Sequence, residues 1–341
     1  MTRVELTTVT TDGAVFHVAG ADGVIVERIT DLEPATSHQH RGVGFTTLPR
    51  PAGGLRCSFA TVNDVHFGET EAGRVSGSEL GPILRVPDGA TPYPDVMNRA
   101  VVAELSALGD GAGPAAVIVK GDLTDDGRPE EFAAFEGCYG PFGDRLHAVR
   151  GNHDAYRGQD DYSGDRWIEL PGVNVALLDT VVPEQSGGAL SAEQLDWLDA
   201  AAESSTEPVV VMGHHPQWFD GMTDKPEFLL GVDASRALDA VLARREAIVA
   251  YAAGHTHRHL VHAAGGGVPS IEVGCVKDFP GVWARYDVYD GGIVQTVHRI
   301  SSVDALEWSE RCRSLYSDFG VDYTTYALDR LEHRCFAIPW R

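Results

Sequence analysis

The sequence predicts an α/β fold, and three observations lead to this prediction. From residue 55 to about residue 300, short apolar runs typical of buried strands alternate with stretches that have a helical period. The chain has 341 residues, which is long enough for one large domain with an appendage. Of these residues, 43% are hydrophobic and 23% are charged, as in an ordinary globular protein.

The first 50 residues are predicted to form a small β-rich module. They are rich in Thr and Val, they alternate weakly as half-buried strands do, and the signals "TDG" and "ADG" mark turns. The stretch "TDLEPATSHQHRGVGFTTLPRP" resembles the later strands of a fibronectin type III module, where L-x-P-x-T-x-Y precedes a strand, with His38 at the tyrosine position. The segment "LPRPAGG" (48–54) then predicts a linker.

Strands and helices alternate through the region 55–300, which we expect to be the main domain. The predicted strands are "LRCSFATV", "AAVIV", "RLHAV", "VNVALLD", "EPVVVM" and "EAIVAYAA". The predicted helices are 94–108, 129–137, 191–203 and 233–245, and Ser191 begins the capping box "SAEQ" of the third. Such alternation predicts sheet strands buried by helices on their faces.

Two features end the chain. The stretches "SIEVGC" and "WARYDVYDGGIVQTVHRI" predict a last antiparallel strand pair, with "DGG" as a turn. Residues 301–341 show a helical pattern and are predicted to be a helical tail. This tail either covers the domain or contacts a second copy in a homodimer, and the sequence leaves both open.

The charge and the cysteines exclude several classes of protein. The formal net charge is −23 and no basic run stands out, so binding to a nucleic-acid polymer is not expected. The start "MTRVELTTVT" lacks the apolar segment of a signal peptide, and no apolar stretch approaches the length of a membrane span. Five scattered cysteines without CxxC spacing fit a reducing cytoplasm, where we expect the protein.

Polar residues follow five of the predicted strands. The endings are "NDVHFGE" with Asp64 and His66, "GDLTDDG" with Asp122 and Asp125, "GNHD" with Asn152, His153 and Asp154, "GHHP" with His214 and His215, and "GHTH" with His255 and His257. Ligands of α/β sheets lie at the carboxyl ends of the strands, so these endings are expected to converge. Glycine precedes four of them, where a chain leaving a strand needs a sharp turn and close backbone approach.

The converging residues predict a pair of divalent metal ions. Nitrogen and oxygen ligands without a thiolate suit Mn, Fe, Zn or Co. Two metals about 3.5–4 Å apart need a bridging carboxylate against their repulsion. Two divalent ions contribute +4, and Asp64, Asp122 and a bridging hydroxide subtract three, which leaves about +1 to attract a phosphate anion and to acidify bound water.

The motifs D-x-H, GD-x-x-D, GNH[DE], GHH and GH-x-H, in this order, resemble the calcineurin-like metallophosphoesterase superfamily, most closely its class III cyclic nucleotide phosphodiesterase branch. The resemblance covers residues 57–300 and implies a four-layer α/β/β/α sandwich. It implies one metal held by Asp64, His66, Asp122 and His257, and a second held by Asp122, Asn152, His214 and His255. It also implies that His153 stabilises or protonates the leaving oxygen of the ester.

The sequence therefore predicts a metal-dependent phosphoesterase, in which a metal-bridging hydroxide attacks phosphorus in line. Because an alkoxide leaving group needs a proton donor such as His153, we favour a phosphodiesterase for small diesters of the cyclic nucleotide or glycerophosphodiester type. A phosphomonoesterase or protein phosphatase on the same scaffold stays open, as does a non-catalytic metal-binding module. A site covered by residues 69–95 or by the C-terminal tail would favour small diesters.

Three further polar residues have less defined roles. Asp154 is predicted to orient a neighbouring ligand, and His215 either lines the pocket or has a structural role. Asp125 stands where purple acid phosphatases have a metal-binding tyrosine, so no purple Fe(III) centre is expected, and we interpret Asp125 as a cap of the following helix.

Overall fold

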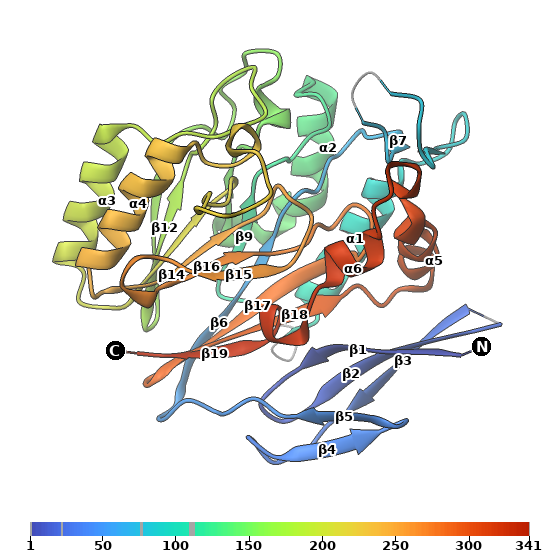
Figure 1. The fold of residues 1–341 in the computed structure, drawn as a ribbon, viewed down its shortest axis with the longest axis horizontal. Helices are drawn as coiled ribbons and strands as arrows, with labels where there is room; N and C mark the ends of the chain where they lie inside the picture. Colours follow the sequence, from blue (N-terminus) through green and yellow to red (C-terminus); the bar gives the residue numbers. More distant parts are fainter. Residues whose placement is uncertain (1, 22, 76–77, 109–112, 341) are drawn as a thin grey trace.

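The computed structural model describes residues 2–21, 23–75, 78–108 and 113–340, and most of them belong to four stacked layers (Figure 1). Two six-stranded sheets pack face to face, and helices cover the outer face of each sheet. The predicted α/β/β/α sandwich with a small β-rich N-terminal part is therefore confirmed. Among the described residues, no helix has the length and apolar character needed to cross a membrane.

The first sheet has the strand order β10–β9–β6–β17–β18–β19. Its strands are β6 (Leu55–Val62), β9 (Val117–Lys120), β10 (Leu146–Val149), β17 (Val282–Tyr289), β18 (Gly292–Arg299) and β19 (Phe336–Pro339). The strands β6, β9 and β10 are parallel, because a helix returns the chain between each of them, and they end at the same edge. The strands β17, β18 and β19 run antiparallel to their neighbours.

The second sheet has the order β11–β12–β13–β14–β16–β15. Its strands are β11 (Arg166–Leu170), β12 (Val173–Leu178), β13 (Val209–Gly213), β14 (Ile248–Ala253), β15 (Leu260–Ala263) and β16 (Pro269–Glu272). The four inner strands are parallel, and the edge strands β11 and β15 are antiparallel to them. Strands buried on both faces explain the continuous apolar runs in the sequence, such as "IVAYAA" in β14.

Helices form the two outer layers. The first sheet is covered by α1 (Tyr93–Ser106), α2 (Pro129–Tyr139) and α5 (Val303–Arg311), and the second by α3 (Ala192–Ser204) and α4 (Val232–Arg244). The helix α3 begins as predicted, because the Ser191 hydroxyl accepts a hydrogen bond from the Gln194 backbone and the Gln194 side chain accepts one from the Ser191 backbone.

The N-terminal residues form strands that pack beside the first sheet, below β18 in Figure 1. The strands β1 (Arg3–Val9), β2 (Ala14–Gly20) and β3 (Gly23–Ile29) form an antiparallel sheet, and β4 (Ser37–His40) pairs with β5 (Val43–Thr46). A hydrogen bond of 2.6 Å from the Thr8 hydroxyl to the Val297 carbonyl joins β1 to β18. This part of the chain therefore supports the edge of the sandwich that carries the C-terminal strands.

The remaining elements are short. They are β7 (Glu71–Ala72), β8 (Leu84–Arg85), α6 (Tyr323–Leu328) and the 3₁₀ helices η2 (Gly140–Arg145), η3 (His153–Ala155), η4 (Pro226–Phe228), η5 (Gly265–Gly267), η6 (Cys312–Ser314), η7 (Ser317–Phe319) and η8 (Leu331–His333).

Two sequence predictions about the end of the chain were wrong. The stretch "SIEVGC" does not pair with "WARYDVYDGGIVQTVHRI", because it forms β16 in the second sheet, whereas the latter folds on itself as the hairpin β17–β18. The segment 301–341 is not helical throughout, because its last strand β19 pairs with β18. A four-residue strand that follows a short helical turn leaves no periodic signal in the sequence.

Candidate metal centre

The five strand endings meet where the two sheets adjoin. Asp64 and His66 follow β6, Asp122 follows β9, and Asn152 and His153 follow β10, all in the first sheet. The second sheet contributes His214 after β13, and His255 and His257 after β14. All these side chains are brought together, as the following distances show.

One group of possible ligands is Asp64, His66 and His257, whose ligand atoms lie within 4.8 Å of one another. The Nε2 atom of His257 is 3.6 Å from the Oδ1 atom of Asp64. The Nε2 atom of His66 is 3.3 Å from the Oδ2 atom of Asp122. Asp122 thus turns one carboxylate oxygen toward this group.

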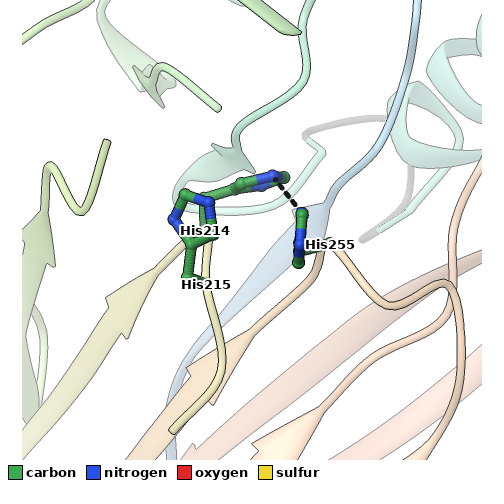
Figure 2. A group of neighbouring side chains, drawn as sticks. All are labelled: His214, His215 and His255. Atoms are coloured by element: carbon green, nitrogen blue, oxygen red, sulfur yellow. Dashed lines mark hydrogen bonds between the residues drawn. The ribbon is translucent and has the colours of Figure 1, made fainter. Parts of the chain in front are cut away.

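The other carboxylate oxygen of Asp122 faces a second group. The Nε2 atom of His214 lies 3.3 Å from the Oδ1 atom of Asp122 and 3.0 Å from the Oδ1 atom of Asn152. Figure 2 shows the rings of His214 and His255 turned toward each other, and their Nε2 and Nδ1 atoms are 3.2 Å apart. Asp122 therefore lies between two groups of donor atoms, as a bridging ligand would.

The hydrogen bonds of the second group leave lone pairs pointing at one another. The Nδ1 atom of His214 donates to the Lys120 carbonyl, so Nε2 carries the lone pair of the neutral ring. The Asn152 amide donates to the hydroxyl of Tyr156, which leaves its oxygen facing His214. Acceptor atoms that converge in this way need a proton or a cation between them.

The first group also needs a proton or a cation among its donor atoms. His66 is 1% exposed, yet neither of its ring nitrogens has a hydrogen-bond partner. Buried imidazole nitrogens without a partner are rare in folded proteins, and a bound ion explains them. The two sets contain only nitrogen and oxygen donors, which suits divalent ions such as Mn, Fe or Zn. The residues present thus fit two divalent metal ions.

The buried carboxylates of the site stabilise positive charge on the groups around them. Although burial opposes the charged form, Asp122 raises the pKa of His214 to about 9. Burial also opposes the charge of His66, but the carboxylates Asp122 and Asp125 raise its pKa to about 10. Burial raises the pKa of Asp64. Metal ions would take the place of the protons that these groups hold.

The backbone at the site is unusual. Five of the predicted ligands, which are not glycine, have a positive φ angle, namely Asp64 (54°), His66 (46°), Asp122 (50°), His255 (70°) and His257 (57°). Such a conformation costs on the order of 1–3 kcal/mol and persists only where the surrounding structure imposes it. Five of the twelve non-glycine residues with a positive φ among the described residues thus lie at these strand endings.

Two glycines let the strand endings approach each other. A side chain at Gly121, where φ is 88°, would collide with the ring of His214. A Cβ atom at Gly151 would collide with the backbone nitrogen and the carboxylate of Asp122. The glycines therefore precede the polar residues because neighbouring ligands occupy the space of a side chain.

His153 lies at the edge of both groups. Its backbone N–H donates to the Oδ1 atom of Asp122 over 3.0 Å, and its ring lies 4.4 Å from that of His66. The Nδ1 atom donates to the Asp125 carbonyl over 2.6 Å, so Nε2 is the nitrogen left for a substrate. Burial lowers the pKa of His153 to about 4.

Asp125 does not cap a helix, contrary to the sequence interpretation. The residue before α2 is Arg128, whose backbone N–H donates to the Glu131 side chain. The Asp125 carboxylate instead lies 3.9 Å from the Nδ1 atom of His66, while its carbonyl holds His153. It lies beside the ligands because the chain turns sharply after Asp122.

Asp154 and His215 lie behind the ligands. The buried Asp154 carboxylate accepts hydrogen bonds from the backbone of Leu123, Thr124 and Gly151, so it ties the ending of β9 to that of β10. The buried His215 ring bonds to the Thr180 hydroxyl over 2.8 Å and lies beside His255, as Figure 2 shows.

Sequence reasoning missed several residues that contact the predicted ligands, among them Tyr156, Asn63 and Asp278. The Asn63 amide donates to the Oδ2 atom of Asp64 over 2.6 Å. The Asp278 carboxylate is buried, lies 3.9 Å from the Nδ1 atom of His257 and accepts a hydrogen bond from the hydroxyl of Tyr323. Neither Asn63 nor Asp278 belongs to a motif, although Asn63 adjoins the predicted D-x-H motif and could have been suspected from that position.

A cleft of about 540 Å³ opens beside His255 and His257. Its other walls come from Val75, from the segment 224–229 and from the C-terminal segment 316–326. Both segments that the sequence analysis named as possible covers of the site thus contribute to the cleft.

The chain is similar to several known proteins. The model of the calcineurin-like phosphoesterase family matches residues 58–259. A probable cyclic nucleotide phosphodiesterase of Rhodococcus erythropolis is 30% identical over 246 residues, which cover 64% of this chain and 78% of that protein. A probable cyclic nucleotide phosphodiesterase of a Synechococcus strain is 27% identical over 166 residues, which cover 45% of this chain and 61% of that protein.

A solved structure resembles the fold. The crystal structure of a dimetal phosphatase from Danio rerio has a TM-score of 0.55 and 17% sequence identity, and the match covers 72% of this chain and 96% of that chain. At this identity the likeness concerns the fold alone.

Proposed function

Because the chain belongs to the calcineurin-like phosphoesterase family, we propose that it is a dinuclear-metal-dependent phosphodiesterase for small phosphodiesters. The observation that carries the proposal is the position of Asp122, whose two carboxylate oxygens face separate groups of nitrogen and oxygen donors, with His153 beside both. The two relatives above are named as probable cyclic nucleotide phosphodiesterases, which supports this reaction class.

The proposed ligands divide into two sets. Asp64, His66, Asp122 and His257 would hold one ion, and Asp122, Asn152, His214 and His255 would hold the other. When bound, two divalent ions supply positive charge for the phosphate and acidity for a water nucleophile. The carbonyl of Lys120 orients His214, and the hydroxyl of Tyr156 orients Asn152, so their donor atoms point inward before binding.

His153 would act on the leaving oxygen through Nε2. The Asp125 carbonyl holds Nδ1–H, so proton transfer from Nε2 requires the doubly protonated ring. Burial disfavours that form, whereas the negative charge of an incoming phosphate ester favours it. The residue is thus suited to protonate an alkoxide only when the substrate is present.

The cleft favours a small diester over a protein substrate. Its walls come from Val75 in one covering segment and from residues 316–326 in the other. A phosphorylated side chain on a protein surface needs an open approach, whereas a cleft of about 540 Å³ suits a small molecule. The alternative on the same scaffold is a phosphomonoesterase, because two metals and a histidine serve that reaction equally well.

The test compares two chromogenic esters on protein reconstituted with Mn²⁺. We expect bis(p-nitrophenyl) phosphate to be hydrolysed with a higher kcat/KM than p-nitrophenyl phosphate, and the same order with Fe²⁺ or Zn²⁺. Preference for the monoester would move the chain to the phosphatase branch. Binding of two metals per chain without hydrolysis of either ester would leave a non-catalytic metal-binding module.

A further inference from the structure

The cleft beside His255 and His257 is lined mainly by apolar and aromatic side chains. They are Val75, Phe228, Leu229, Tyr316, Phe319, Val321, Tyr323 and Tyr326. Apart from backbone groups and the two histidines, its polar lining consists of Thr256, Asp224 and Lys225. A phosphate ester bound at the histidines would therefore place its organic part against an apolar wall.

Five of these eight side chains are exposed to solvent, which costs free energy unless a ligand covers them. Among the described residues, nine large apolar side chains are exposed, and five of them line this cleft: Val75, Phe228, Phe319, Val321 and Tyr326. The three exposed aromatic residues of that set, Phe228, Phe319 and Tyr326, are all in the cleft. A concentration of exposed apolar surface at one place marks a binding site.

The aromatic wall is fixed to the turn that carries the histidines. The Tyr326 hydroxyl donates to the carbonyl of Thr256, the residue between His255 and His257. The guanidinium of Arg258 lies 5.5 Å from the centre of the Tyr326 ring, and Glu272 holds that guanidinium over 2.8 Å. The ring thus has a defined position next to the metal centre.

A second tyrosine extends the wall. The ring centres of Tyr323 and Tyr326 are 6.1 Å apart, with an angle of 21° between the planes. The hydroxyl of Tyr323 donates to Asp278, which lies beside His257. Tyr323 is buried and holds the neighbouring ring of Tyr326, and the exposed Tyr326 ring is the one that can face a flat ligand.

We propose that this cleft binds a planar ring that belongs to one of the two alcohols esterified in the phosphodiester. The substrate would then be an aryl or nucleoside ester and not a glycerol ester. The inference rests on the proposed phosphodiesterase function and narrows its substrate class. Aromatic side chains stack on flat rings whatever substituents those rings carry. A glycerol chain could not stack in this way, and the exposed aromatic side chains of the cleft would stay in contact with water. The volume of about 540 Å³ accommodates one such ring system.

The test uses three diesters on the Mn²⁺-loaded protein: 3′,5′-cyclic AMP, bis(p-nitrophenyl) phosphate and glycerophosphoethanolamine. We expect the two ring-bearing diesters to have at least about tenfold higher kcat/KM than the third, from stacking. Phe319→Ala and Phe228→Ala should raise KM for the ring-bearing diesters about tenfold and leave glycerophosphoethanolamine within about twofold. Activity on the aryl diester alone would assign the cleft to aryl rings, and activity on both would extend it to nucleobases.

Matched variants separate stacking from folding. Phe319→Leu keeps an apolar side chain and removes the ring, so it should behave like Phe319→Ala. Val303→Ala, at a side chain of α5 that is exposed and outside the cleft, should change no KM. Equal losses for all three diesters in the Phe variants, or no loss for the ring-bearing ones, would overturn the inference.

A binding measurement distinguishes failure of the cleft from failure of the reaction. By calorimetry, phenylphosphonate should bind the Mn²⁺-loaded protein about tenfold more tightly than methylphosphonate, and Phe319→Ala should abolish the difference. Equal binding of the two phosphonates to the unaltered protein would refute the ring subsite. Absence of diester hydrolysis together with the expected binding would refute the phosphodiesterase proposal alone.

Discussion

His153 is the residue whose chemistry the structure defines most closely. Its Nδ1–H is engaged by a carbonyl, its backbone is held by Asp122, and its Nε2 is left for the substrate. We predict that His153→Ala lowers kcat at least about 10²-fold for diesters with alkoxide leaving groups, because general acid catalysis contributes on this order. The loss should be smaller for p-nitrophenyl esters, whose leaving group needs no proton.

His153→Asn separates proton transfer from positioning. Its amide nitrogen lies as far from Cβ as Nδ1 does and can still donate to the Asp125 carbonyl, but it cannot transfer a proton, so this variant should be as slow as His153→Ala on alkyl diesters. Steady-state kinetics with both leaving groups and metal analysis of both variants check this. Unchanged kcat on alkyl diesters at full metal content would refute the role of His153.

Site residues that follow a buried strand could be predicted from the sequence. Asp122 and His214 stand directly after glycines that end buried apolar runs, and such runs can be recognised in a single sequence. Asp278 acts through one contact with His257, from a position without a periodic or motif signal. Asp125 was misinterpreted because a short polar loop before a helix resembles a cap, whereas the loop turns back toward His66.

At the scale of elements, the site depends on how closely the ending of β9 approaches that of β10. Gly151 has no space for a side chain, because the backbone and carboxylate of Asp122 occupy it. We predict that Gly151→Ala displaces Asp122 and destabilises the protein by about 1–3 kcal/mol, as overpacking does. Bound metal should fall from two ions to one or fewer per chain, measured by elemental analysis after dialysis.

Gly137→Ala is the matched control for this prediction. Gly137 lies in α2, is exposed, and a Cβ atom there would meet nothing within 4 Å. Because alanine favours helix, this variant should bind metal normally and gain about 0.5–1 kcal/mol of stability. Full metal binding by Gly151→Ala would show that the two strand endings can move apart.

The elements that could be predicted are those buried on both faces or amphipathic over several turns. The strands β6, β12 and β14 and the helix α3 match the predicted ranges within two residues at each end. The edge strands β11, β15 and β19 were not predicted, because they are short and partly exposed on one or both faces. Their places depend on contacts with distant strands, which local patterns do not record.

At the scale of the whole molecule, three parts of the chain meet at one carboxylate. Glu310 on α5 accepts hydrogen bonds from Arg299 on β18 over 2.7 Å, from Arg313 in η6 over 2.8 Å and from Arg3 on β1. Glu5 on β1 bonds to the same Arg313. The net charge of −23 gave no hint of this arginine cluster. The division into units 1–50, 55–300 and 301–341 stays a prediction. The contacts of Glu310 and Glu5 join residues from all three of these units.

We therefore predict that Glu310→Gln weakens the whole fold. The substitution removes the negative charge that faces the buried guanidinium of Arg299. We expect the free energy of unfolding to fall by about 2 kcal/mol, which is less than for a fully buried pair because Glu310 is partly exposed. The midpoint of urea denaturation should fall at pH 7. Glu307→Gln, at an exposed position of the same helix, should leave the midpoint unchanged.

The pH dependence of this difference identifies its cause. Although burial opposes the charge of Glu310, the bonds from Arg313 and the charge of Arg299 lower its pKa from 4.5 to about 2. A carboxylate whose pKa is depressed in the folded state contributes stability above its unfolded pKa, and the contribution is lost as the pH falls through the folded value. The stabilities of the unaltered protein and of Glu310→Gln should thus converge between pH 4.5 and about pH 2. A difference that stays constant over this range would mean that the substitution acts through packing and not through charge.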